Sequence, residues 1–452
     1  MPSSEEAHQC VRDAIALFRT AVRRVQADRL LAASSPDEWV RGAPEEYERV
    51  RVVGMGKAAM SMAGSLETQC SEWVDEGLVI VPEGYPESFP DSLPAPDTID
   101  VQTGGHPLPS AEGVRGARHV RAQAEAATDG ELLLVLVSGG GTALSTLPAE
   151  PLDLADLRTT YHQLLTSGVP IGPANAVRKH LTTLGGGQLA DIAAPATTAG
   201  LVVSDVVGND LATVASGPTV PDPTTYDDAV RALYTYGLWH EVPEAVRTYL
   251  AGGAQGQLPE TPSSDAPCFD AARTTLLGTN ELALEAARAA AENRGYEVRS
   301  VTPGVTGEAR RVGAEHGQHL RSADVERPTC WLWGGEPTVT VTGDGTGGRN
   351  QEVALSAAQA LEGDPRDAVF LSGGTDGVDG PTDAAGAWGT PATAQRARDA
   401  GLDPEAHLNR NDSYPVFDAL GQLLQPGPTH TNVMDIHIGL VRPHEGEIRP
   451  NT

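Results

Sequence analysis

Residues 132–142 read Leu-Leu-Leu-Val-Leu-Val-Ser-Gly-Gly-Gly-Thr, an unbroken apolar run that ends in three glycines between two hydroxyl residues. Such a run, bounded by glycine, is typical of a strand buried on both faces of a parallel sheet. Similar runs recur, many of them followed by glycine and then by alanine-rich helical sequence, at 50–53, 78–81, 201–203, 275–277, 297–301, 330–333, 338–342 and 368–371. This alternation predicts an α/β fold with mainly parallel sheets.

The chain has 452 residues, which is enough for more than one domain. Residues 251–267 are rich in Gly, Pro and Ser and lack periodicity, so they are expected to form a linker. We therefore predict an N-terminal α/β domain over residues 1–250 and a C-terminal α/β domain over residues 268–452. Apolar residues at helical spacing over residues 5–33 predict that an amphipathic helix opens the chain.

The composition is strongly acidic. Asp and Glu number 61 against 32 Lys and Arg, the formal net charge is −29, and Lys57 and Lys179 are the only lysines. This balance excludes a nucleic-acid binder with a broad basic face and disfavours an anionic membrane as partner. Acid excess together with lysine depletion favours a halophilic protein, because molar salt shortens the Debye length to about 3 Å. An ordinary acidic protein with arginine-rich codon usage is the alternative.

Nothing in the sequence indicates secretion or membrane insertion. The first residues lack the cationic and apolar regions of a signal peptide, and the apolar runs are too short to span a bilayer. The cysteines have no metal-ligand spacing, which disfavours a zinc site or a disulfide framework and suits a reducing compartment; they are Cys10, Cys70, Cys268 and Cys330. We expect a cytoplasmic monomer or homodimer.

Glycine-rich turns at strand ends are the candidate ligand sites of the N-terminal half, because open α/β sheets bind ligands beyond the carboxyl ends of their strands. The turn 54–59 (GMGKAA) fits the dinucleotide pattern G-x-G-x-x-A, but its Lys57 suits a carboxylate or a phosphate. A second turn offers backbone N–H groups to an anion; its residues are Ser138, Gly139, Gly140, Gly141 and Thr142. Asp205 lies at the end of a predicted strand. There it could act as a general base, bind Mg²⁺, orient a hydroxyl group or cap a helix, and the sequence leaves these roles open.

The C-terminal half has three comparable turns. Gly334, Gly335 and Glu336 follow one strand, residues 343–352 follow a second and open a helix, and Gly374 and Asp376 follow a third. Asp376 is a candidate Mg²⁺ ligand, with a solvated turn residue as the alternative.

Three cationic positions in the sequence call for an explanation. Arg349 is expected at a helix N-terminus, where it opposes the helix dipole unless an anionic phosphate lies between them. His106 is expected to be a structural hydrogen-bonding residue. The cluster around Lys179 attracts an anionic substrate or covers the domain interface, and the sequence leaves both open.

Several anion cradles, a few cations and several carboxylates suit phosphoryl transfer, in which positioning and charge neutralisation dominate catalysis. Two other classes stay open. The G-x-G-x-x-A turn suits an NAD(P)H-dependent reductase, and a binding protein for sugar acids or nucleotides would need no turnover.

The order of the motifs GMGKAA, GGHPLPS, SGGGTALS, NAVRKHLTTLGGGQLA, SDVVGNDLATVASGPTVPDPTTY, GGEPTVTVTGDGTGGRNQE and LSGGTDGVDGPTDAAGA resembles the glycerate 2-kinase family, also called MOFRL or class II glycerate kinases. The resemblance covers about residues 7–440, and the blocks 204–226 and 334–352 are the most specific. Asn209 departs from the acidic or Gly-Asp pair of many relatives, but Asp210 still follows.

The resemblance implies ATP- and divalent-cation-dependent phosphorylation of D-glycerate at its 2-hydroxyl group. It also implies two Rossmann-like three-layer domains with the active site in the cleft between them. By the family's pattern, Lys57, Arg349 and Asp205 are catalytic and also bind substrate, together with the loop from Ser138 to Gly141. The nucleotide and its Mg²⁺ are assigned to matching motif positions in the C-terminal half, namely Gly334, Gly335, Glu336, Gly374, Asp376 and Asn432. Because some relatives have been labelled hydroxypyruvate reductases, that activity is the alternative.

Overall fold

A computed structural model describes residues 4–40 and 46–443. The chain folds into two units, and each contains a six-stranded sheet. The central unit is Ala27–Gly278, and the terminal unit combines the residues up to Gln26 with those from Thr279 onward. The α/β class is confirmed, and the cleft between domains stays a prediction. Residues 1–3 and 444–452, at the outer ends of the two expected domains, lie outside the described residues.

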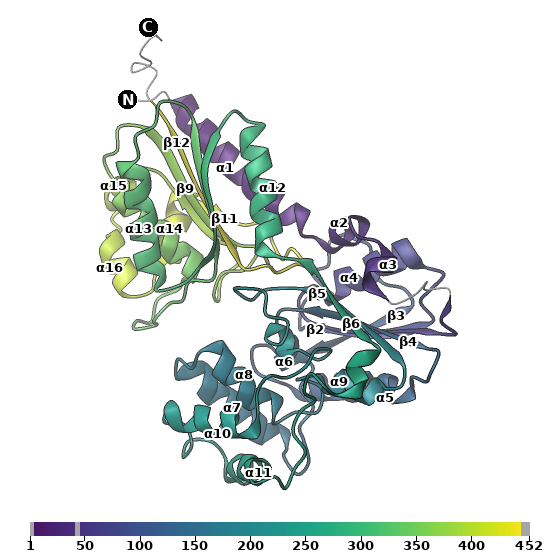
Figure 1. Ribbon diagram of the computed structural model, residues 1–452. Coiled ribbons are helices and arrows are strands. Elements are labelled where there is room, and N and C mark those ends of the chain that lie inside the picture. The colour runs from purple at the N-terminus through teal and green to yellow at the C-terminus, as the bar shows by residue number, and fades with distance from the viewer. Residues whose placement is uncertain (1–3, 41–45, 444–452) are drawn as a thin grey trace. The chain divides into compact units, whose positions relative to one another are not determined.

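The sheet of the central unit is entirely parallel, as the apolar runs predict. Its strands lie in the order β3-β2-β1-β4-β5-β6 (Figure 1). The strands are β1 (Val50–Met55), β2 (Glu76–Pro82), β3 (Ile99–Gly104), β4 (Leu132–Ser138), β5 (Thr197–Val203) and β6 (Ala272–Gly278). The chain runs outward from β1 to β3 and then returns to place β4 beside β1. This reversal is the point at which open α/β sheets bind their ligands.

Helices cover both faces of this sheet (Figure 1). One layer holds α2 (Ala27–Ala32), α3 (Pro36–Trp39) and α4 (Ala59–Cys70), and the other holds α5 (Ala111–Ala126) and α9 (Gln188–Ala193). The apolar side chains of β1, β2 and β4 are buried against α5 and α9 in one continuous core. Three short helices, α6 (Gly141–Leu144), η2 (Val214–Ser216) and η3 (Pro267–Asp270), complete the loops.

Four further helices of the central unit pack on one another around a separate apolar core (Figure 1). They are α7 (Leu154–Thr166), α8 (Ile171–Lys179), α10 (Tyr226–Thr235) and α11 (Glu244–Ala254). The side chains of Leu157, Val177 and Leu233 are fully buried in this core. Capping boxes at Asp153 and Thr225 begin α7 and α10, because each side chain accepts a backbone N–H of the first helical turn.

The sheet of the terminal unit is mixed, which corrects the expectation of two mainly parallel sheets. Its order is β11-β10-β9-β12-β8-β7; β12 runs antiparallel to both of its neighbours, and β7 and β8 are parallel. The strands are β7 (Glu297–Val305), β8 (Thr329–Gly335), β9 (Asp367–Gly374), β10 (Gly386–Gly389), β11 (Leu423–Leu424) and β12 (Asp435–Arg442). The reversed direction of β12 places its amino end beside the carboxyl ends of β8 and β9.

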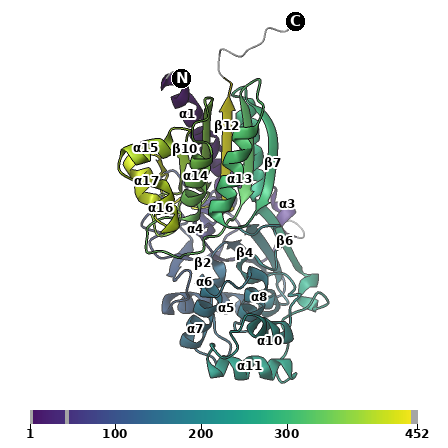
Figure 2. The same ribbon diagram turned by 90° about the vertical axis from the view of Figure 1, so that its left-hand side faces the viewer.

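Helices α1 (Ser4–Arg24) and α12 (Asn280–Glu292) cover one face of this sheet, and α13 (Ala309–Ser322) and α14 (Arg349–Ala360) cover the other (Figure 2). Three short helices surround α14, namely α15 (Thr393–Asp399), α16 (Pro404–Asn409) and α17 (Ser413–Leu420). The apolar stripe of α1 is buried as its spacing predicts, and Asp13 accepts a hydrogen bond from Tyr296 at 2.9 Å.

The structure divides the chain differently from the composition. The opening helix belongs to the terminal unit, and residues 251–267 lie within the central unit because β6, which follows them, pairs with β5. The stretch 338–342 was expected to be a strand, and this was wrong: only Thr338 makes an isolated bridge. Its alternation of Thr and Val has no sheet to join, and the side chain of Val341 is 74% exposed.

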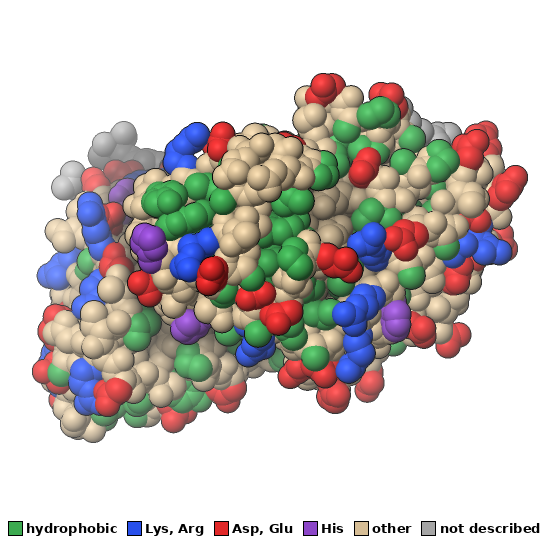
Figure 3. All heavy atoms as spheres, turned by 90° about the horizontal axis from the view of Figure 1, so that it is seen from below, with side chains coloured by type: hydrophobic (Ala, Val, Ile, Leu, Met, Phe, Trp, Pro, Cys, Tyr) green, Lys and Arg blue, Asp and Glu red, His purple; other side chains and the backbone are tan. Residues whose placement is uncertain are grey.

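Acidic side chains dominate the charged surface, as the net charge requires. On the face shown in Figure 3, Asp and Glu are spread widely, and Lys and Arg stand among them without forming a continuous basic patch. Within the described residues, no helix is both long and apolar enough to cross a membrane.

Candidate active site

The two glycine-rich turns of the central unit are in direct contact. β1 and β4 are paired neighbours, so the turns that follow Met55 and Ser138 leave the same edge of the sheet side by side. The backbone N–H of Lys57 donates to the carbonyl of Gly139 at 2.9 Å, and the N–H of Ala58 donates to Ser138 Oγ at 2.9 Å. Lys57 is half-buried and immediately precedes α4. The two turns are therefore neighbours in the fold, and their joint binding of a substrate stays a prediction.

The glycine at position 56 is required by close packing. Its φ is +122°, and a Cβ atom there would lie 2.3 Å from Ser138 Oγ. The Ser138 side chain is fully buried, and its hydroxyl group stabilises the Lys57 turn by accepting the N–H of Ala58. The helix after the second turn, α6, is a single turn, so its dipole adds little, and the anion cradle depends on the glycine backbone itself.

Two other residues lie at this edge of the central sheet. Asp205 follows β5, which pairs with β4 up to Ser138. A Cβ atom at Gly140, whose φ is +86°, would lie 3.1 Å from the His106 ring. His106 therefore contacts the glycine-rich loop. The sequence predicts only a structural hydrogen-bonding role for His106, because β2 and β1 separate β3 from β4 in the sheet and a lone histidine does not indicate this contact.

In the terminal unit, Arg349 is held by two carboxylates. Its Nε and Nη2 donate to the two oxygens of Asp435 at 2.7 and 3.0 Å, and its Nη1 donates to Glu336 at 2.7 Å. Burial alone lowers the pKa of the guanidinium group, but Asp435 and Glu336 outweigh it and raise the pKa. The Arg349 side chain remains 34% exposed. Two carboxylates thus face the cation at the start of α14.

Asp435 is the principal site residue that sequence reasoning missed. It is the first residue of β12, is fully buried, and pairs with Gly335 of β8 and Gly374 of β9. The motif HTNVMD contains it, but the antiparallel strand that follows was not expected. The apolar alternation Ile436, Ile438 and Leu440 was the available signal.

A buried aspartate caps the helix that carries Arg349. Asp379 accepts the backbone N–H groups of Asn350 at 3.1 Å and Gln351 at 2.9 Å. Burial raises the pKa of Asp379 to about 7, although these two N–H groups lower it. A Cβ atom at Gly348 would lie 2.3 Å from the Asp379 carboxyl carbon, so the glycine before the helix leaves room for the cap.

The remaining predicted residues of the terminal unit lie around the same strand ends. Gly374 ends β9, and Asp376 follows it and accepts the N–H of Val378 at 3.1 Å. Asn432 precedes β12 and accepts the N–H of Met434 at 3.1 Å. The backbone N–H of Thr429 donates to the carbonyl of Asp376 at 3.1 Å, which joins the two loops.

Gly334 and Gly335 are explained by packing. A Cβ atom at Gly334 would lie 1.8 Å from Asn280 Oδ1, and one at Gly335 would lie 2.1 Å from the carbonyl of Val305. Neither close approach involves a ligand. Packing alone therefore explains why both residues are glycine. A nucleotide contact at either of them stays a proposal.

The second lysine has an internal partner. Lys179 Nζ lies 3.0 Å from Asp222 Oδ1, and the two side chains are 3% and 0% exposed. The neighbouring Arg178 is also buried, and its guanidinium carbon lies 5.2 Å from the centroid of the Tyr161 ring. Lys179 thus forms an ion pair inside the central unit, which is neither of the two uses that the sequence left open.

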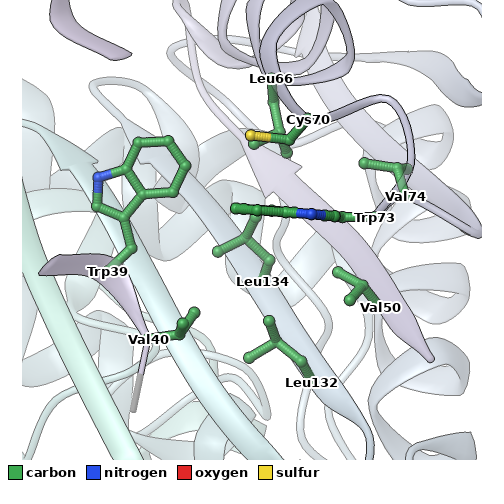
Figure 4. A pocket seen from close by; sticks show the side chains of 9 residues that line it. All are labelled: Trp39, Val40, Val50, Leu66, Cys70, Trp73, Val74, Leu132 and Leu134. Atoms are coloured by element: carbon green, nitrogen blue, oxygen red, sulfur yellow. The ribbon is translucent and has the colours of Figure 1, made fainter. Parts of the chain in front are cut away.

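An apolar pocket opens elsewhere in the central unit, lined by Trp39, Val40, Val50, Leu66, Cys70, Trp73, Val74, Leu132 and Leu134 (Figure 4). Val50 and Leu132 begin β1 and β4, so this pocket lies at the sheet edge opposite to Lys57. Burial raises the pKa of the Cys70 thiol to about 11, which keeps it neutral. The pocket offers no charge to a carboxylate or a phosphate.

Comparison with known proteins places these motifs in a family. A domain of unknown function (DUF4147) matches residues 13–251, and the MOFRL family matches residues 329–435. A glycerate 2-kinase of Pyrococcus horikoshii is 36% identical over 426 residues, which cover 92% of this chain and 93% of that protein. The chain belongs to the glycerate 2-kinase family.

Two further relatives of this family are informative. A crystal structure of glycerate kinase from Thermotoga maritima has a TM-score of 0.81 at 34% identity and covers 96% of this chain and 100% of its own. A protein of Agrobacterium vitis, provisionally named as a hydroxypyruvate reductase, is 37% identical over 431 residues, 94% of each chain. The family is thus shared by proteins named for two different reactions.

Proposed function

We propose that this chain is a glycerate 2-kinase, which transfers the γ-phosphoryl group of ATP to the 2-hydroxyl group of D-glycerate. The observation that carries the proposal is the position of Lys57. One of only two lysines in the chain, it stands half-buried in the first of two touching glycine-rich turns, at the reversal point of a parallel sheet. The other lysine, Lys179, forms a buried ion pair with Asp222. The glycerate kinase names of the relatives support the same reaction.

The central unit supplies the acceptor side of this chemistry. Lys57 neutralises the glycerate carboxylate or the transferring phosphoryl group, and the backbone of Gly139 to Gly141 binds the anion. Ser138 shapes the turn through its bond to Ala58. Asp205 orients the 2-hydroxyl group and accepts its proton as the oxygen attacks the γ-phosphorus. A new O–P bond forms, the bond to the β,γ-bridging oxygen breaks, and ADP leaves.

The terminal unit supplies groups for the nucleotide phosphates. Arg349, oriented by the bidentate contact with Asp435, stabilises phosphate charge, and an arriving anion displaces the hydrogen bond from Arg349 Nη1 to Glu336. We keep Gly334, Gly335, Gly374 and Asn432 as proposed nucleotide contacts.

Mg²⁺ fits the residues only as part of a nucleotide complex. The described residues contain no group of three or more His, Cys, Asp or Glu that could hold a metal ion. Magnesium commonly binds through one or two carboxylates and the substrate phosphates, and the carboxylate of Asp376 suits that role. When bound, the ion would neutralise charge on the phosphates.

The alternative, an NAD(P)H-dependent hydroxypyruvate reductase, is favoured by the strand order of the central sheet and by the name of the Agrobacterium relative. One observation opposes it. In a dinucleotide fold the second glycine of the turn lets the backbone approach the pyrophosphate, whereas the corresponding Gly56 is packed against Ser138.

The wild-type protein decides between these functions. It is incubated with D-glycerate, ATP and MgCl₂ at molar KCl, and phosphorus NMR identifies the product isomer. Formation of 2-phosphoglycerate supports the proposal. Oxidation of NADH by hydroxypyruvate without phosphoryl transfer would establish the reductase, and ligand-induced stabilisation without turnover would indicate a binding protein.

Variants then test the residue roles. Lys57→Ala is expected to lower kcat/KM by about 100-fold or more, the size of effect seen when one group that stabilises transition-state charge is removed. Arg115→Ala, which removes an exposed cation of the same unit, is the matched control and should change little. Asp205→Asn should lower kcat, because the 2-hydroxyl group loses its proton acceptor. Near-wild-type turnover in Lys57→Ala would refute the role of Lys57 alone.

A further inference from the structure

A strained turn lies beside the glycine-rich loop of the central unit. Three consecutive residues, Ala215, Ser216 and Gly217, have φ values of +46°, +62° and +57°. Only glycine adopts this left-handed conformation without a steric penalty. Two non-glycine residues in succession persist there only if the surrounding structure holds them. We call this segment, Ala215–Gly217, the left-handed turn.

A second glycine run holds the left-handed turn through its backbone. The N–H of Gly186 donates to the carbonyl of Ser216 at 2.7 Å, and the N–H of Gly187 donates to the carbonyl of Gly217 at 2.8 Å. Asn175 Nδ2 of α8 donates to the carbonyl of Thr213 at 3.0 Å. The glycines at 185–187, which the sequence shows without an evident reason, are thus explained by this backbone-to-backbone contact.

The buried ion pair anchors the far end of the same segment. Asp222 accepts hydrogen bonds from Lys179 Nζ and Thr261 Oγ1, both at 3.0 Å. Gly186 packs closely against this carboxylate, because a Cβ atom at Gly186 would lie 2.8 Å from Asp222 Oδ2. Helix α8, the second glycine run and residues 215–222 are therefore joined into one block by hydrogen bonds and a charge pair.

This block touches the proposed anion cradle at two points. Ser216 Oγ lies 2.9 Å from Thr142 Oγ1, and a Cβ atom at Gly141 would lie 2.7 Å from Ala215 Cβ. The carbonyl of Thr142 is fixed in turn by Thr146 Oγ1 at 2.7 Å. Thr142 and Ser216 also line a small pocket, together with Ser145.

We propose that the left-handed turn is a positioning element for the glycine-rich loop, and that Ser216 acts through Thr142 to hold the backbone of Gly139–Thr142 in its ligand-binding conformation. The inference rests on the proposed function for its substrate, D-glycerate. A loop of three glycines has a large conformational entropy, which a ligand must otherwise remove on binding. A rigid neighbour that fixes the loop in advance lowers the KM, and the Ser216 hydroxyl group need not touch the substrate.

A double-mutant cycle tests this coupling. Thr142→Val and Ser216→Ala each remove one side of the hydroxyl pair, and each is expected to raise the KM for D-glycerate about tenfold with kcat within about threefold of wild type. Because both changes break the same contact, the double variant should be no more than about threefold worse than the worse single variant. Thr142→Ser keeps the hydroxyl group and should restore most of the affinity. Thr166→Val, at an exposed threonine that bonds a helix carbonyl, is the control.

Hydrogen exchange gives a readout that does not need activity. In Ser216→Ala, backbone N–H groups of residues 139–142 should exchange at least about fivefold faster than in wild type, whereas exchange in β4 stays unchanged. Independent, multiplicative effects of the two substitutions on KM, or unchanged exchange in the loop, would overturn the proposal. If the wild-type protein does not phosphorylate glycerate, the proposed function fails while the exchange measurement still decides the positioning role.

Discussion

A histidine buried without hydrogen-bond partners in the described part of the chain, together with a half-buried histidine beside it, makes the terminal unit sensitive to acid. His437 of β12 is fully buried, and its ring centroid lies 5.6 Å from that of His316 of α13. Neither ring nitrogen of His437 has a hydrogen-bond partner within the described part of the chain. Burial, with a smaller contribution from Arg349, lowers the pKa of His437 to about 3; burial and the neighbouring His437 lower that of His316 to about 3.

The sign follows from where the protons bind. Between pH 6.5 and pH 3 the unfolded chain protonates His437 and the folded chain does not, so acid favours unfolding. The contribution of His437 to the unfolding free energy is constant above pH 6.5 and is lost as the pH falls toward 3. Each pH unit corresponds to about 1.4 kcal/mol per group, so His437 alone should cost about 2 kcal/mol of unfolding free energy between pH 6.5 and pH 5.

The perturbation is His437→Leu, which keeps an apolar side chain of similar size in the strand and removes the titrating ring. The unfolding free energy is measured by urea denaturation at constant KCl between pH 7 and pH 5, with the fluorescence of Trp331 and Trp333 reporting on this unit. We expect the acid loss to be smaller than in wild type by about 2 kcal/mol at pH 5. At pH 7 the variant should be as stable as wild type or more stable, because it no longer buries an unpaired polar ring.

The variant removes the His437 titration and also the part of the lowered His316 pKa that His437 causes, and both changes reduce the acid loss. Asp379, with a pKa near 7, has the opposite sign, since its folded form binds a proton more readily than its unfolded form, but wild type and variant share it. The control is His162→Gln at an exposed histidine. Parallel stability profiles for wild type and His437→Leu would refute the reasoning.

Three further outcomes follow from the structure. Lys179→Met leaves Asp222 as an unpaired buried charge and should cost about 3–5 kcal/mol in urea unfolding, with partial recovery when Asp222 is also replaced by Leu. Gly348→Ala displaces the Asp379 cap and should cost about 0.5–2 kcal/mol by the same measurement, and an unchanged midpoint would contradict it. If the acidic surface reflects a salt-rich habitat, the thermal midpoint should rise between 0.1 and 2 M KCl; a flat or falling midpoint would argue for the ordinary acidic protein.

Much of the central unit could be read from its residues. The apolar run at 132–137 and its shorter counterparts fall on buried strands, and the glycine turns around Lys57 and Gly140 meet at one sheet edge. A parallel strand buried on both faces has a nearly continuous apolar sequence, and its direction fixes which end carries the loop. The cytoplasmic location, the monomeric or homodimeric state and the salt-rich habitat stay predictions.

The terminal unit was less predictable, because its sheet depends on pairings between distant segments. Strand direction leaves no mark on a short apolar run, so the antiparallel placement of β12, and with it Asp435 beside Arg349, was not foreseen. The run 338–342 alternates like a strand but finds no neighbour to pair with. The opening helix also joins the far end of the chain, since its apolar stripe fits the second sheet.

The sequence by itself determined the α/β class, the glycine-rich turns and the rarity of lysine, because these properties are local and each is written in adjacent residues. Tertiary structure decided what each charge does. Lys179 forms an ion pair with Asp222 in the interior, and Arg349 forms ion pairs with two carboxylates. Lys57 lies in a glycine-rich turn that contacts a second one. The physical reason is that a charge is defined by its partners and its distance from water, and both are set by segments that meet only when the chain is folded.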